Sequence, residues 1–197
     1  QVGDILVSQL GERELDGAIF VVANLLNEGS VTSKGAKRVR LAEINLQAAR
    51  KATECAAFES AAKYTAKGIE MLPSNHWQDN FELALELYST AAEAEGYIGD
   101  VEKIEAHCSE VLDQTKCSFS EKLRVYNVLM DSIANRDRMS EAVDLCLDVL
   151  KQSGCTFPQK SIPIALSTVA GVVRIKATVK SRTTEEISKI PFMTDAG

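Results

Sequence analysis

The two histidines and five cysteines of this sequence are the side chains best suited to bind a metal ion. His107 and Cys108 are adjacent, and adjacent residues on a helix point in different directions. A structural zinc site needs about four converging ligands, and the cysteines form no C-x-x-C pair. We therefore predict no metal site. The odd number of cysteines favours buried free thiols over a disulfide framework.

Closely spaced carboxylates are the next candidates for chemistry. Glu93 with Glu95, and Glu102 with Glu105, have the spacing of possible acid–base pairs. Such pairs catalyse reactions only when their surroundings separate their two pKa values, and these segments are acidic with no apolar pocket implied nearby. No nucleophile stands in a G-x-S-x-G elbow, although a triad assembled from distant residues would leave no such pattern. We predict no catalytic residue in this segment.

Charge and missing motifs restrict the possible ligands. No stretch matches the phosphate loop G-x-x-x-x-G-K-[S/T], so we predict no cofactor in this segment. The formal net charge of −6 argues against nucleic-acid binding, which needs a basic surface. One local basic cluster could contact an acidic partner or simply begin a helix: Lys34, Lys37, Arg38 and Arg40.

The chain begins at Gln1 without the basic and apolar regions of a signal peptide. No apolar run approaches the roughly 20 residues of a membrane span, so we expect no membrane insertion. With the cysteine usage, this favours a cytoplasmic location. Because the initiating Met is missing, we expect a fragment of a longer multidomain protein.

Apolar residues recur every three or four positions along nearly the whole chain, which is typical of amphipathic helices. A content of 45% hydrophobic but only 6% aromatic residues also suits closely packed helices better than sheets. We predict an all-α fold, with helices over residues 77–95 and 164–180 among others. Residues 164–180 are rich in Val and Ile and would also suit a strand. We predict turns at residues 96–100 and 135–138.

Two single residues are predicted to shape the helix ends and the core. Ser120 is predicted to be the N-cap of the helix that follows it. Trp77 precedes Phe81 by four residues and is predicted to pack between helical hairpins as a hydrophobic staple.

The helices recur at an even pitch. Three apolar positions repeat at an offset of 38 residues, near the ~34-residue tetratricopeptide period: Ile104 with Ala142, Cys108 with Cys146, and Val111 with Val149. We predict an α-solenoid of antiparallel helical hairpins that forms one helical-repeat domain over residues 1–197. Its hairpins would span about 12–53, 56–95, 100–135 and 139–180.

Two local patterns resemble the tetratricopeptide repeat. An aromatic residue, two small residues and a closing proline resemble its second helix: Phe58, Ala61, Gly68 and Pro73. Residues 99–101, Gly-Asp-Val, are similar to its turn. The small residues would let two backbones approach closely.

A longer resemblance covers most of the chain. Residues 41–52, 68–73, 81–88 and 190–195 are similar to the helical region behind the AAA-like or STAND-type ATPase module of large signalling proteins. Kinase, histidine-kinase, GAF or cyclase domains accompany that module. The resemblance implies that any nucleotide chemistry lies outside this segment.

We therefore predict a non-catalytic scaffold or regulatory segment of a signalling ATPase. Its partner would be a protein, a peptide or a neighbouring domain of the same chain, held in a concave groove. The possible groove contacts are Glu82, Glu86, Asn127 and Asp131. Two alternatives stay open: an all-α enzyme with a spatially assembled site, and a structural or oligomerisation spacer.

Overall fold

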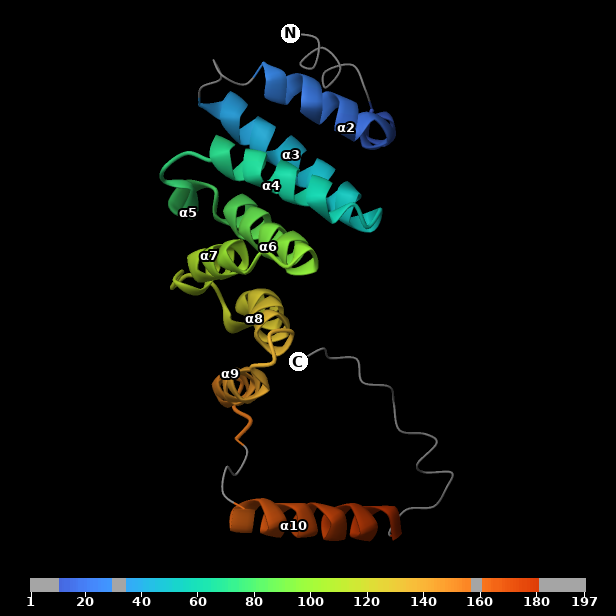
Figure 1. Cartoon of the computed structure of the whole chain (residues 1–197), viewed down its shortest axis with the longest axis vertical. Helices are drawn as coiled ribbons and strands as arrows, with labels where there is room; N and C mark the ends of the chain where they lie inside the picture. The colour runs from blue at the N-terminus through green and yellow to red at the C-terminus, as the bar shows by residue number, and fades with distance from the viewer. Residues whose placement is uncertain (1–10, 30–34, 157–160, 181–197) are drawn as a thin grey trace. The chain divides into compact units, whose positions relative to one another are not determined.

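The computed structural model of the chain describes residues 11–29, 35–156 and 161–180 (Figure 1). These residues form helices, turns and loops but no strand, so the predicted all-α class is confirmed. Residue contacts divide the chain into two units, Gln1–Val149 and Leu150–Gly197. Among the described helices, none is both long and apolar enough to cross a membrane.

The first unit is a succession of helices joined by short turns. Their bounds are α2 (Glu12–Glu28), α3 (Ala36–Glu54), α4 (Phe58–Met71), α5 (His76–Asp79), α6 (Phe81–Ile98), α7 (Val101–Leu112), α8 (Phe119–Ala134) and α9 (Met139–Gln152), whose last turn enters the second unit.

The second unit contains α10 (Ser161–Lys180). Residues 164–180 are therefore helical, and the strand alternative is wrong. The side chains of α10 that the structure describes include several exposed apolar ones: Leu166, Val169, Val172, Val173 and Ile175.

Each long helix of the first unit from α2 to α8 packs against the next long one in the chain, as Figure 1 shows. In addition, α3 contacts α6, and α6 contacts α8. These second-neighbour contacts place α3, α6 and α8 side by side, while α4 and α7 pack between them in sequence. The arrangement brings together side chains that lie far apart in the chain.

The turns that follow α3, α6 and α8 share one backbone feature. Ala56, Gly99 and Asp137 all have positive φ, at 55°, 87° and 57°. Each stands two residues before the next helix begins. A left-handed residue reverses the chain direction after a helix, and glycine adopts it without strain.

The predicted 38-residue offset also separates the helix starts. It separates Phe81 from Phe119, the first residues of α6 and α8, and Val101 from Met139, the first residues of α7 and α9. The same offset relates an ion pair at the start of α7, Asp100 with Lys103, to one at the start of α9, Arg138 with Glu141. The two pairs have exchanged charges, so the geometry recurs although the residues differ.

Three local predictions are wrong. Residues 96–98 continue α6 instead of forming a turn, and Gly99 is the C-cap of the helix. The N-cap of α8 is Ser118 and not Ser120, because Ser118 and Glu121 form a capping box with each other's backbone. Trp77 belongs to the separate short helix α5, since the backbone leaves the helical conformation at Asn80.

Trp77 nevertheless packs against the core, with ring partners that belong to its own predicted hairpin and not to a neighbouring one. Its ring stacks on Tyr88 with centroids 5.4 Å apart and meets the edge of Phe81 at 6.0 Å. The core itself consists of fully buried residues from α2 to α8, the largest being Leu41, Ile44, Leu87, Ile104, Val22, Val111 and Val125.

A close approach of α4 to α6 centres on Gly68. A Cβ atom at this position would lie 2.5 Å from Cδ2 of Leu87 and 3.4 Å from Cβ of Asn45. Leu87 is fully buried. Only glycine therefore fits here without displacing a core side chain.

Two asparagines pair across α2 and α3. Each of Asn27 and Asn45 donates its amide N–H to the other's carbonyl oxygen at 2.9 Å. Asn45, which is fully buried, also donates to the backbone carbonyl of Leu41 at 2.9 Å. The pair satisfies a polar group that would otherwise lie unpartnered in the core.

Replacing Asn27 with alanine is expected to lower the free energy of unfolding by about 1–2 kcal/mol, because it leaves the buried side-chain oxygen of Asn45 without its donor. Urea denaturation followed by circular dichroism measures the change. Asn127→Ala, which removes the same side chain from an exposed position on α8, should change stability by less than about 0.5 kcal/mol. Equal losses in the two variants would contradict this interpretation.

Candidate functional site

A row of alternating charges crosses the adjacent helices α3, α6 and α8. Arg50 on α3 donates to Oε2 of Glu86 on α6 at 2.6 Å, and Nη1 of Arg124 on α8 binds the same oxygen at 3.0 Å. Arg124 also donates two hydrogen bonds to the carboxylate of Glu93, from Nε at 2.6 Å and from Nη2 at 2.8 Å. A further bond runs from Arg124 to the hydroxyl of Thr90 at 3.3 Å. We call Arg50, Glu86, Arg124 and Glu93 the charge ladder.

The charge ladder shifts the pKa values of two of its members, Arg124 and Glu86. The hydrogen bonds to Glu93 raise the pKa of Arg124 the most, against an opposing effect of burial. Partial burial raises the pKa of Glu86, but the hydrogen bonds and charges of Arg50 and Arg124 outweigh it, so the pKa lies below its ordinary value. These shifts keep Glu86 and Arg124 charged near neutral pH. Their charges cancel, and Arg124 has few donors left for another ligand.

A cleft of about 600 Å³ opens beside the charge ladder. Glu93 forms part of its wall, and residues near the C-terminal ends of α3, α6 and α8 form most of the rest: Thr53, Tyr97, Val128, Asp131, Ser132 and Asn135. Asp131 is exposed and has no ion-pair partner among the described residues. The hydroxyl of Ser132 is buried without a hydrogen-bond partner, and the residue is only 8% exposed.

A second hollow, of about 570 Å³, also has Tyr97 in its lining. It is lined by Phe58 and Ile98 together with the backbone and side chains of residues 56, 57, 59 and 60. Tyr97 is 69% exposed and stacks on Phe58, with ring centroids 4.0 Å apart. The two hollows thus share an aromatic wall that projects from the end of α6.

The predicted groove residues have different surroundings. Glu86 is a member of the charge ladder and Asp131 lines the cleft. Glu82 and Asn127 are exposed on α6 and α8, and neither lines either hollow. Sequence reasoning missed Arg124, which holds the most contacts of the site. The sequence contains a signal for this residue. The charge alternates in sign from Arg50 to Glu86 to Arg124, at spacings close to the 38-residue offset.

The carboxylates that have the spacing of acid–base pairs in the sequence have separate partners in the structure. Glu93 is bound by Arg124, whereas Glu95 is buried at 5% exposure and pairs with Lys103 at 3.3 Å. Glu105 pairs with Arg136 at 3.2 Å. Among the described residues no three of His, Cys, Asp and Glu lie close enough together to hold a metal ion.

The cysteines are free, but not all of them are buried. Cys55 and Cys155 are exposed, so the prediction of buried thiols holds only for Cys108 and Cys117, with Cys146 partly buried. Burial raises the pKa of Cys108 to about 12, and its thiol donates to the carbonyl of Val125 at 3.6 Å. Cys108 is therefore unreactive as a nucleophile.

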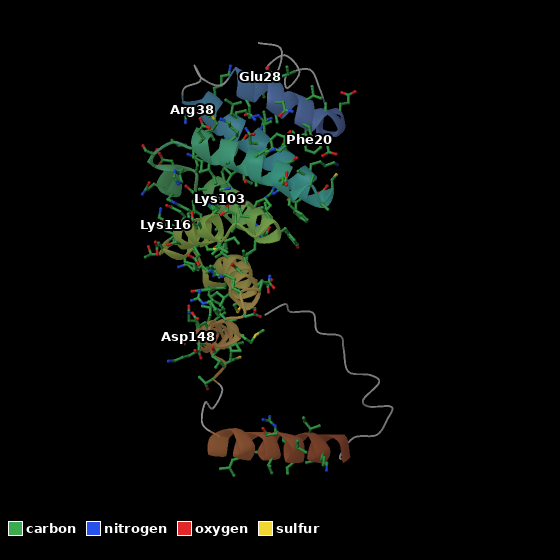
Figure 2. All side chains as sticks on the ribbon, viewed as in Figure 1. Phe20, Glu28, Arg38, Lys103, Lys116 and Asp148 are labelled. Carbon is green, nitrogen blue, oxygen red and sulfur yellow. The ribbon has the colours of Figure 1, made fainter. Side chains whose placement is uncertain are left out.

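Part of the basic cluster has a structural role. Arg38, near the start of α3 (Figure 2), donates to the carbonyl oxygens of Met71 and Glu70 at the end of α4. Arg40 pairs with Glu43 at 2.8 Å. Arginine at a helix C-terminus satisfies carbonyl groups that have no partner within the helix. Lys34, like residues 190–195 of the family resemblance, lies outside the described residues.

His107 on α7 should make the fold sensitive to acid. Burial, above all, lowers its pKa; Glu95, Glu110 and Asp100 oppose this and Lys103 adds to it. The unfolded chain then binds a proton more readily than the folded one, so stability is full above the unfolded pKa of about 6.5 and declines as the pH falls below it. We expect His107→Gln to show a shallower loss of stability between about pH 7 and pH 5, measured by urea denaturation. Parallel pH profiles would show that His107 does not contribute.

The candidate site therefore consists of a neutral charge ladder, an acidic cleft and an aromatic wall, all within the first unit. Nothing that lines the cleft is a nucleophile activated by a neighbouring base. No protein-family model, curated protein or solved structure matches the chain.

Proposed function

We propose that this chain is a non-catalytic, tetratricopeptide-like scaffold that binds a protein segment on the face formed by α3, α6 and α8. The cleft beside Asp131 carries the proposal, because three helices that lie side by side contribute to its walls. An α-solenoid presents such a shared surface to peptides or neighbouring domains. The 38-residue recurrence of α6 with α8 and α7 with α9 supports this architecture.

The residues around the cleft favour binding over catalysis. Glu93 is already held by Arg124, and the remaining walls offer an amide, hydroxyls, a carboxylate and an aromatic ring. Groups of this kind recognise a peptide backbone and its side chains. The exposed Tyr97 is the type of anchor that contributes strongly to interfaces.

Peptide display tests the binding function. Phage that display random dodecapeptides should yield enriched sequences on the immobilised chain, and their synthetic copies should bind in fluorescence anisotropy. We expect these peptides to compete with one another and to perturb the amide signals of residues at the ends of α6 and α8 in NMR spectra. If no sequence is enriched, or if the perturbed residues lie elsewhere, the proposed binding surface is wrong.

Light scattering coupled to size-exclusion chromatography separates this function from that of an oligomerisation spacer. We expect a monomer whose mass does not change across a wide range of concentrations. A stable dimer that fails to bind any displayed peptide would favour the spacer.

We further propose that the scaffold is cytoplasmic and belongs to a signalling ATPase, as the family resemblance implies. The buried free thiols of Cys108 and Cys117 suit a reducing compartment. Sequencing the encoding gene upstream of Gln1 tests the association. A phosphate loop followed by this segment in one reading frame is expected, and a complete reading frame without one would contradict it.

A further inference from the structure

We draw no further inference here: the strongest candidate, the apolar stripe on α9 formed by the exposed Met139 and Val143 beside the partly buried Cys146, is an unpartnered helix face, and nothing in the structure shows what covers it.

Discussion

Gly68→Val is expected to lower the free energy of unfolding by about 3 kcal/mol or more, the largest effect of any single glycine replacement in the first unit. The new Cβ would stand 2.5 Å from Cδ2 of Leu87, a fully buried side chain that would have to move within the packed core. Overpacking of this kind typically costs 1–3 kcal/mol. The branched side chain adds strain within α4. Urea denaturation followed by circular dichroism measures the loss.

Gly17→Val is the matched control. Gly17 also lies inside a helix, α2, but a Cβ atom there would meet nothing within 4 Å. Valine has a higher helix propensity than glycine, so this variant should be neutral or slightly more stable. Similar losses at the two glycines would show that helix propensity, and not the contact of α4 with α6, controls stability.

Arg124→Glu is expected to destabilise the first unit by about 2–3 kcal/mol, because it replaces the shared cation of the charge ladder with a third carboxylate. The size of this effect is limited by solvent, since the Arg124, Glu86 and Glu93 side chains remain 37%, 35% and 29% exposed. The loss should shrink in about 1 M salt, where charges are screened within about 3 Å. Denaturation at low and high salt measures both.

A charge exchange provides the control. Glu93→Arg combined with Arg124→Glu restores one opposite pair and should recover part of the stability. Arg138→Glu removes an arginine that pairs with Glu141 on the exposed surface, so it should have a much smaller effect. An equally large loss in Arg138→Glu would mean that net charge, and not the ladder, is responsible.

The sequence predicted helices well because apolar spacing records which side of each helix is buried. Ile104, Cys108 and Val111 are buried on α7, as their spacing indicated. Helix ends were less predictable. Gly96 looked like a turn residue, yet it lies inside α6 where a Cβ would come within 3.3 Å of Val128 on α8. A glycine needed for a close approach looks the same in sequence as one needed for a turn.

The candidate site was harder to predict than the fold. Glu86 and Asp131 were selected by their positions, but their partners depend on which helices lie side by side. Arg124 is 31 residues from Glu93 and 38 from Glu86, and only the packing of α8 on α6 brings them together. Glu82 lies on the same helix as Glu86 and is also acidic. Its side chain faces solvent and therefore has no surroundings comparable to those of Glu86.

The order of helix contacts has a consequence for the folding rate. In the first unit, every extensive contact joins helices separated by at most one other long helix. Such local connectivity gives a low contact order, and proteins of low contact order fold in microseconds to milliseconds. The ion pairs of Arg124 and Glu86 connect α3, α6 and α8. The amide protons of these three helices should therefore exchange with solvent through one common opening in a hydrogen-exchange experiment.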